Sequence, residues 1–310
     1  MTENTQKQIF LCSVAALVCL ALSSSALAAE ALVPGTSIAL DKDKNVTARV
    51  DQGPDGLSVS LMAAGSPART IGLPKDIGAV DTIALVSGSK VAVIGEVSSS
   101  GKELLLYNES GTQPVDQILC YQPAISPDGT RVAFTRFFPG HFVNEQQASN
   151  TAMLYDIRSG AAGNRAAGTP VSDDQDVGFQ LYPHETNAAP THTFMSDNYF
   201  WSPDSTRMIF LDEQYPKPAT SAKAAVPRNI HLPPGAGLTF VMVDFTSGSP
   251  KVSSFETDIC ATHTGPTCFV RLTGVEFGAT GIKADLKGFD VKAAFQRSVE
   301  LTPDQFVPLQ

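Results

Sequence analysis

The sequence predicts an all-β protein that is built from copies of one small sheet. Two observations support this. A Ser-Pro-Asp turn followed by an apolar strand occurs twice, at residues 126–134 and 202–210. Each copy continues into another apolar strand that stops at a polar Ser-Gly turn, at residues 154–160 and 242–248. Internal repeats of this kind indicate a repeated architecture.

The chemistry of the turn explains the strands on either side of it. The first copy reads Ser-Pro-Asp-Gly-Thr-Arg-Val-Ala-Phe and the second reads Ser-Pro-Asp-Ser-Thr-Arg-Met-Ile-Phe. Proline presets φ for the second position of a turn, and Asp and Gly favour the positions that follow. The apolar residues after the turn are typical of a buried strand. Phe134 and Phe210 are therefore predicted core residues at equivalent positions.

A third and weaker copy lies upstream. Residues 87–93 resemble 128–134, about 41 residues later, which is close to the period of propeller repeats. Residues 106–111 then resemble the second half of the repeat. Four short strands in each unit describe a β-propeller blade. Degenerate units at 45–72 and 268–301 give about five four-stranded blades, with six as the alternative. A terminal strand is expected to complete the sheet begun at the other end.

The run Ser-Pro-Asp-Gly followed by Thr-Arg-Val-Ala-Phe resembles the TolB-type propeller repeat, which also occurs in prolyl-oligopeptidase-like enzymes. The resemblance covers two units well and a third weakly. It implies an architecture and leaves the function open, because propellers host many activities. The chain has no Gly-x-Ser-x-Gly elbow of a peptidase domain, and a strand pattern begins too early for the N-terminal domain of TolB. The alternative fold is an all-β sandwich with two similar hairpins.

The N-terminus has the pattern of a signal peptide, predicted at residues 1–28. Lys7 precedes an apolar run, and an Ala-Leu-Ala sequence ends at Ala28, as is typical of a cleavage site. An uncleaved membrane anchor and a lipid-modified Cys19 are the alternatives. Residues 29–310 are then a single propeller domain, periplasmic or secreted from a bacterium. No later segment is long and apolar enough to span a membrane.

The charge and the cysteines restrict the partners and the chemistry. The formal net charge is −9, and an acidic chain without a basic stripe is a poor ligand for nucleic acid. We expect a monomer. Cys260 and Cys268 flank a short loop, and export permits a disulfide between them. Cys120 is then left over, as a buried apolar residue or, alternatively, a reactive thiol.

Three long insertions interrupt the repeat, at residues 137–150, 173–197 and 213–236. If the Ser-Pro-Asp turn joins the first two strands of a blade, the topology sends all three insertions to the opposite face. Loops of this length are usually functional or disordered. The predicted ligand or partner face comprises His141, Glu145, Asp173, Asp174, Asp176, His184, Glu185, His192, Arg228 and His231. The alternative is that exposed insertions simply collect polar residues.

Neither a metal site nor a catalytic group is assigned. No spacing in the insertions matches a known ligand pattern, so no cofactor is predicted. The alternative is a calcium or zinc site in the middle insertion, because carboxylates suit calcium and imidazoles suit zinc. An acid–base pair of the glycosidase type would draw on Asp81 or on acidic residues of the insertions. Trp201 is interpreted as core packing against Phe200 or its neighbours, which leaves no exposed Trp to bind a sugar.

The resulting hypothesis is an exported, non-catalytic propeller that binds a protein partner or ligand through its loop-decorated face. The alternative is an exported hydrolase or lyase that uses carboxylates and His at the same face. Convergence of two carboxylates and a His within about 6–9 Å in a deep pocket would favour the enzyme.

Overall fold

The structure is a computed structural model that describes residues 31–41, 45–97, 101–108, 111–136, 151–160, 178–182, 192–193, 198–213, 215–216, 238–257, 259, 268–290 and 293–309. All strand pairs in this part of the chain are antiparallel. The predicted all-β class is confirmed. The signal peptide falls outside these residues and stays a prediction. No helix in the described ranges is long and apolar enough to cross a membrane.

The first sheet has the order β1-β2-β3-β4. Its strands are β1 (Ser37–Asp41), β2 (Val46–Gly53), β3 (Gly56–Met62) and β4 (Arg69–Gly72). The Gly-Pro-Asp-Gly sequence forms the turn between β2 and β3, whose ladder ends at the pair Gly53↔Gly56. The degenerate unit predicted at 45–72 is therefore a real sheet.

The second and third sheets share one long strand, β8. A continuous run of seven strands has the order β11-β10-β9-β8-β7-β6-β5. Residues up to Cys120 of β8 pair with β7, whereas Tyr121 to Ile125 pair with β9. Gln122 has a φ of 50°, and this irregularity marks the change of partner. The strands are β5 (Ile77–Val86), β6 (Lys90–Val97), β7 (Gly101–Tyr107), β8 (Pro114–Ile125), β9 (Arg131–Arg136), β10 (Thr151–Asp156) and β11 (Phe179–Tyr182).

The fourth and fifth sheets complete the stack. The fourth has the order β13-β14-β16-β17-β21 and the fifth the order β18-β19-β20. A separate two-stranded ladder joins β12 (His192–Thr193) to β15 (Tyr215–Pro216). The remaining strands are β13 (Tyr199–Trp201), β14 (Arg207–Glu213), β16 (Leu238–Asp244), β17 (Lys251–Thr257), β18 (Cys268–Phe277), β19 (Ile282–Asp290), β20 (Ala293–Leu301) and β21 (Val307–Pro308).

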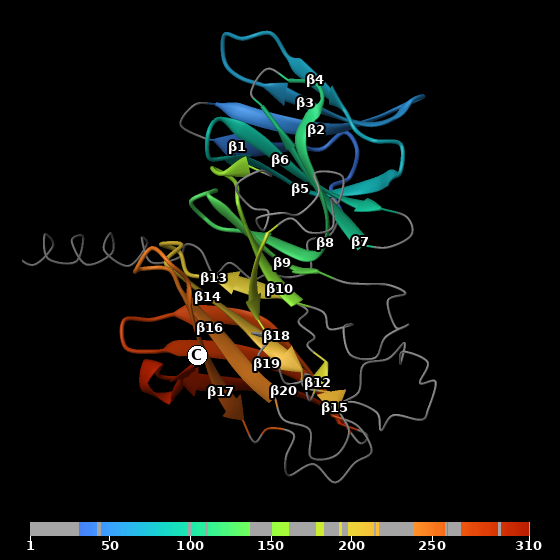
Figure 1. The fold of residues 1–310 in the computed structure, drawn as a ribbon. Coiled ribbons are helices and arrows are strands. Elements are labelled where there is room, and N and C mark those ends of the chain that lie inside the picture. The colour runs from blue at the N-terminus through green and yellow to red at the C-terminus, as the bar shows by residue number, and fades with distance from the viewer. Residues whose placement is uncertain are drawn as a thin grey trace, which may run out of the picture.

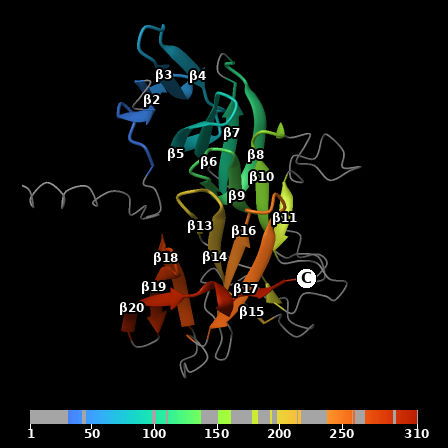
Figure 2. The ribbon, with the colours of Figure 1, turned by 90° about the vertical axis from the view of Figure 1, so that its left-hand side faces the viewer.

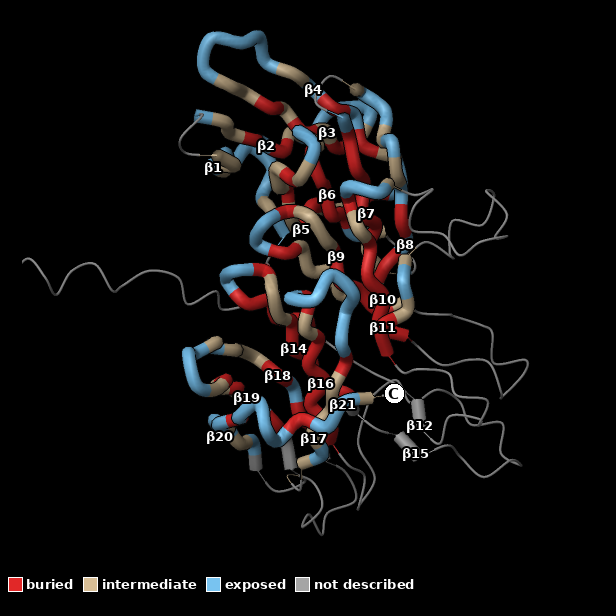
Figure 3. The backbone as a smooth tube through the Cα atoms, turned by 60° about the vertical axis from the view of Figure 1, so that its left-hand side comes forward, coloured by how far each residue is buried: buried red, intermediate tan, exposed pale blue. Residues whose placement is uncertain are grey.

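The sheets stack in chain order, from β1–β4 at one end of the molecule to β18–β20 at the other (Figures 1 and 2). Four hydrophobic clusters lie between successive sheets. Strands of the inner sheets are therefore buried along most of their length (Figure 3). Because successive side chains alternate between faces, a strand between two neighbours needs apolar residues at every position, as in Met208–Leu211.

The predicted closure of the sheets into a ring is not confirmed. The C-terminal strand β21 pairs with β17 of the fourth sheet, and no ladder joins the first and last sheets within the described ranges. A 3₁₀ turn at Pro303–Gln305 redirects the chain after β20. Phe306 then packs near Phe255, with ring centroids 6.1 Å apart. Phe306 thus packs in the interface between the fourth and fifth sheets, whereas Leu309 packs against the cluster between the third and fourth.

The two Ser-Pro-Asp turns have the same internal hydrogen bonds in separate neighbouring sheets. Ser126 Oγ donates to Asp128 Oδ1 at 2.6 Å, and Ser202 Oγ donates to Asp204 Oδ1 at 2.6 Å. The backbone N–H of the Thr two residues after each Asp donates to the same carboxylate oxygen, at 3.0 and 3.1 Å. In this way the aspartate closes the turn and satisfies its backbone donors.

The basic residue that follows each turn reaches the next sheet along the chain. Lys90 Nζ of the second sheet donates to Ile157 O of the third at 3.0 Å. The guanidinium of Arg131 lies 4.7 Å from the ring centroid of Phe245, and that of Arg207 lies 5.6 Å from the centroid of Phe277. These contacts, two of them cation–π, explain why the repeat keeps a Lys or Arg at this position.

Trp201 and Cys120 are both buried. The predicted core role of Trp201 is confirmed, but the indole stacks on Phe245, with ring centroids 5.3 Å apart. Phe200 is not its partner, because adjacent residues of a strand point to opposite faces. The indole Nε1 donates to Ala124 O at 3.0 Å. Cys120 is a free, buried cysteine, and burial raises the pKa of its thiol, so the interpretation as an apolar core residue is favoured over a reactive thiol.

Phe134 and Phe210 are 2% and 0% exposed and fill successive interfaces between sheets. We predict that replacing either with Ala lowers the free energy of unfolding by about 3–5 kcal/mol, because a buried ring leaves a cavity behind. Urea denaturation followed by far-UV circular dichroism measures this loss. A loss below about 1 kcal/mol at both positions would contradict their place in the core.

Gly129 and Ser205 occupy the same turn position with φ of 65° and 59°, but we predict different responses to mutation. A Cβ on Gly129 would lie 3.0 Å from Val86 Cα, so Gly129→Ala should cost about 2–4 kcal/mol. Ser205 Oγ accepts the N–H of Asp128 at 2.9 Å. Ser205→Gly loses that bond but relieves the left-handed backbone, so its net effect should stay within about 1 kcal/mol. Equal losses in urea denaturation would refute this difference.

Candidate functional site

In the third sheet, the last residue of β9, the first residues of β10 and the last residue of β11 lie side by side, at the end of the sheet opposite its Ser-Pro-Asp turn. In the third sheet, Thr151 pairs with Arg136 and Ala152 pairs with Tyr182. In the fourth sheet, Leu238 pairs with both Glu213 and Thr257. β9, β11, β14 and β17 therefore all end on the side opposite the turns of their own sheets.

Two buried hydrogen bonds show that these ends belong to one face of the molecule. Thr135 Oγ1 of the third sheet lies 2.6 Å from Tyr199 Oη of the fourth. Tyr182 Oη of the third sheet donates to Asp212 Oδ2 of the fourth at 2.7 Å. The residues involved sit at or next to the strand ends. We call this face, defined by the last residues of β9, β11, β14 and β17, the loop end.

Four long connections of the fourth sheet and its neighbours start and finish at the loop end. They are the connections of β9 to β10 (137–150), β11 to β13 (183–198), β14 to β16 (214–237) and β17 to β18 (258–267). At the opposite end, the turns after β8, β13 and β16 span only a few residues. The exception at that end is the connection of β10 to β11, which spans residues 157–178.

The structure divides the insertion predicted at 173–197. Strand β11, Phe179–Tyr182, lies inside this range and forms the outer strand of the third sheet. Residues 183–197 follow β11 and so leave from the loop end. Residues 173–178 precede β11 and belong to the connection at the opposite end. The strand is short, which is why the sequence does not separate it from the insertion.

Two of the loop-end connections meet in the ladder β12–β15. His192 pairs with Pro216, and Thr193 pairs with Tyr215. His192 and Thr193 belong to the connection of β11 to β13, whereas their partners belong to that of β14 to β16. The backbone of His192 therefore lies beside that of Pro216, in the connection of β14 to β16. Sequence reasoning placed these segments on one face but did not find the contact between them.

A layer of buried polar side chains lies beneath the loop end. Tyr182, Tyr199, Asp212 and Thr135 are each at least nine-tenths buried. Burial, and then the negative charge of Asp212, raises the pKa of the Tyr182 hydroxyl, so this group stays protonated and donates to the carboxylate. Buried polar groups are tolerated only when hydrogen bonds satisfy them. The layer therefore fixes how the third and fourth sheets meet.

Most residues of the predicted ligand or partner face lie outside the part of the chain that the structure describes. They are His141, Glu145, Asp173, Asp174, Asp176, His184, Glu185, Arg228 and His231. Only the backbone of His192 is described. Their roles remain predictions. Cys260 also falls outside these ranges, so the Cys260–Cys268 bridge remains a prediction too.

The described residues offer few alternatives for chemistry. Asp81, a candidate acid or base by position, is 5% exposed and forms an ion pair with Lys102, with Nζ 2.5 Å from Oδ2. No group of three His, Cys, Asp or Glu suited to hold a metal occurs among the residues that the structure describes. Sequence reasoning missed the pair Tyr182–Asp212 and the pair Thr135–Tyr199, because nothing in an apolar run shows which polar residue meets a partner in another sheet.

Comparison with known proteins identifies no family. No protein-family model matches the chain, and neither does any curated protein. Among solved structures, it is similar to TolB from Agrobacterium tumefaciens, with 12% identity over 83% of this chain and 77% of that chain and a TM-score of 0.31. It is also similar to an uncharacterized protein from Listeria monocytogenes, with 9% identity over 88% of this chain and 83% of that one and a TM-score of 0.32.

A third similar structure is the acylaminoacyl peptidase from Pyrococcus horikoshii, with 12% identity over 70% of this chain and a TM-score of 0.35. The chain spans about a third of the length of the acylaminoacyl peptidases that it matches, 31% and 32%. Likenesses at these identities and TM-scores transfer neither an activity nor a residue role to this chain.

We predict that Tyr182→Phe lowers the free energy of unfolding by about 1–3 kcal/mol, because Asp212 loses a donor in a buried site. The matched control is Tyr107→Phe. Tyr107 is 0% exposed, and its hydroxyl has no hydrogen-bond partner among the described residues, so this change should be neutral or stabilising. Urea denaturation measures both. Equal losses would show that the hydroxyl of Tyr182 contributes nothing specific.

Proposed function

We propose that this chain is an exported, non-catalytic β-propeller that binds a protein partner or a ligand through its loop end. The observation that supports the proposal is the difference between the two ends of the sheets. Hydrogen-bonded turns of a few residues occupy most of one end, whereas four long connections start and finish at the other. Binding residues are commonly carried on loops that a rigid scaffold positions.

The proposed architecture is a propeller in which the five sheets are five blades. Three observations support this count. Each sheet shares a hydrophobic cluster with the next. The turn after β5 contacts the turn after β8 through Ser87 N and Gly129 O, 2.8 Å apart, and that turn contacts the next through Asp128 and Ser205. The basic residue after each turn reaches the following sheet.

The buried polar layer gives the proposed binding face a rigid base. Tyr182 and Asp212 hold the strand ends from which two connections leave, and the ladder between His192 and Pro216 joins these connections to one another. A partner would therefore meet several chain segments held at a constant spacing. Preorganisation of this kind reduces the entropy lost on binding.

The proposal predicts the effect of replacing residues 217–232 with a short Gly-Ser linker. Cooperative thermal unfolding should be retained, because these residues lie between β15 and β16, and loop-closure entropy changes slowly with length. Capture of a partner from the extract of the source bacterium, identified by mass spectrometry and confirmed with the purified partner, should be lost. Collapse of the fold would show that the segment belongs to the core.

The matched control is a similar deletion at the opposite end, of residues 161–172 in the connection of β10 to β11. Capture should persist in this variant. If both deletions leave capture unchanged, the loop end is not the binding face. If the intact protein instead turns over a substrate, and His184→Ala abolishes turnover without unfolding, the alternative of an exported hydrolase or lyase replaces the proposal.

A further inference from the structure

The fifth sheet ends in a long strand whose outer edge pairs with no other strand in the part of the chain that the structure describes. This strand is β20, which has nine residues and follows β19 in the order β18-β19-β20. Figures 2 and 3 show it at the margin of the molecule. The first four sheets each contain at least four strands, counting β8 in both the second and the third, whereas the fifth contains three.

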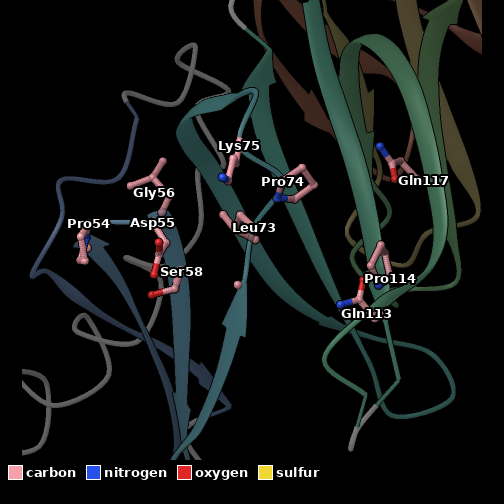
Figure 4. Close-up of a pocket in the computed structure, with 13 residues that line it drawn as sticks. Pro54, Asp55, Gly56, Ser58, Leu73, Pro74, Lys75, Gln113, Pro114 and Gln117 are labelled. Atoms are coloured by element: carbon pink, nitrogen blue, oxygen red, sulfur yellow. The ribbon is translucent and has the colours of Figure 1, made fainter.

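The last strands of the other sheets have features that discourage pairing with another chain. β4 and β11 have four residues each, and β21 has two. Pro74 follows β4 and Pro114 begins β8, and both line the groove between the first two sheets (Figure 4). An extra residue, Val115, interrupts the ladder of β8 with β7. Short strands, prolines and bulges are means by which proteins protect the edges of sheets.

β20 has none of these features. Its ladder with β19 runs without a register shift from Ala293 to Leu301, and it contains no proline. A regular edge of this length presents a row of unpaired backbone donors and acceptors, which is a template for a further strand.

The unpaired backbone groups of β20 belong to particular residues. A Cβ on Gly281 would lie 2.9 Å from the carbonyl oxygen of Leu301, and Gly281 precedes Ile282, the residue that pairs with Leu301. This oxygen therefore points toward β19. Because the direction of the backbone groups alternates along an antiparallel strand, four residues direct their N–H and C=O groups to the open edge. They are Ala294, Gln296, Ser298 and Glu300, and all four are exposed.

The charges of the fifth sheet favour a second copy of the chain as the molecule that pairs with this edge. Its three strands carry four basic and four acidic residues, so their formal charges cancel, whereas the whole chain carries −9. Two copies that meet at this edge bring neutral sheets together, and the acidic parts of the molecules stay apart. The basic residues are Arg271, Lys283, Lys287 and Arg297, and the acidic residues are Glu276, Asp285, Asp290 and Glu300.

The side chains of β20 restrict the register of such a pair. Two copies related by a twofold axis pair the same strand with itself in antiparallel orientation. An axis at Arg297 would place two guanidinium groups directly opposite each other, which is unfavourable. An axis at Gln296 instead places Arg297 opposite Phe295 of the other copy, where a cation–π contact can form. The same kind of contact joins Arg131 to Phe245 within the chain.

We propose that two copies of this chain associate by antiparallel pairing of β20 around a twofold axis at Gln296. The two fifth sheets then form one continuous sheet, in which Ala294 and Ser298 of each copy pair with Ser298 and Ala294 of the other. The sequence alone predicts a monomer, because it does not reveal which strand lies at an open edge. β20 is not part of the loop end, so this proposal and the proposed function can fail separately.

The first test is sedimentation velocity of the purified protein between about 1 and 200 µM. The salt concentration is about 0.15 M, at which repulsion between two acidic molecules is largely screened. A reversible dimer should form with a Kd of about 1–100 µM, because two paired edges bury less area than a standard interface. A monomer over the whole range overturns the proposal and leaves the edge open to a strand of a different protein.

Charge variants assign the contact to β20. Gln296→Lys places two positive charges opposite each other at the axis, so it should weaken association by about tenfold or more. Gln296→Glu should do the same with two negative charges, and an equimolar mixture of the two variants should restore the dimer. Val307→Lys is the matched control, because Val307 is 66% exposed on another outer strand, β21, and it should associate like the original protein. Thermal unfolding checks that all three variants are folded.

Cross-linking tests the register. Gln296→Cys should give a covalent dimer with a short bismaleimide, because paired residues of an antiparallel ladder have Cα atoms only about 5.5 Å apart. Ser298→Cys is the matched control: it is also exposed, but it lies four residues along the strand from its copy, or about 14 Å away, and should not react, nor should the parent protein. The proposal is overturned if Gln296→Lys dimerises like the original protein, if the mixture stays monomeric, or if Ser298→Cys cross-links and Gln296→Cys does not.

Discussion

Burial of the inner sheets on both faces is the constraint on which the rest of this structure depends. Residues of one strand alternate between the cluster shared with the preceding sheet and the cluster shared with the next. Met208 and Phe210 pack toward the third sheet, while Ile209 and Leu211 pack toward the fifth. A sheet in this position cannot shift by one residue without moving one set of side chains into the wrong interface. The stack therefore holds the register of each strand.

The turns also connect each sheet to its neighbour by direct contacts. Each Ser-Pro-Asp turn satisfies its own backbone donors and also presents groups to its neighbour, so that Gly129 lies against Val86 while Ser205 accepts the N–H of Asp128. The difference between Gly and Ser at this one repeat position is thus explained by the contact that each must make. Most long connections leave from the other end, where residues of the strands, and not of tight turns, make the hydrogen bonds between the third and fourth sheets.

The proposed binding face uses both the connections at one end of the stack and the packing beneath them. The loop end combines long connections with a rigid polar layer beneath them, as expected for recognition of a partner.

How much was predictable from the sequence can be judged from particular residues. The repeat around Asp128 and Asp204 predicted the all-β class, the two equivalent hairpins and the burial of Phe134 and Phe210, because turn chemistry and strand burial are local properties that neighbouring residues reveal. The basic residue after each turn was visible as part of the repeat, but its partners Ile157, Phe245 and Phe277 were not.

Only the tertiary structure decided which residues from distant segments meet. It paired β21 with β17, divided the insertion at 173–197 with β11, and brought Tyr182 to Asp212 and Gln117 to Glu103. Each of these contacts joins different strands, and three of the four join residues at least 25 positions apart in the sequence. The sequence by itself determined the repeating unit, because the residues that form its turn and its strands all lie within each copy. The packing of one copy on another depends on side chains that no single copy contains, and it was decided by the fold.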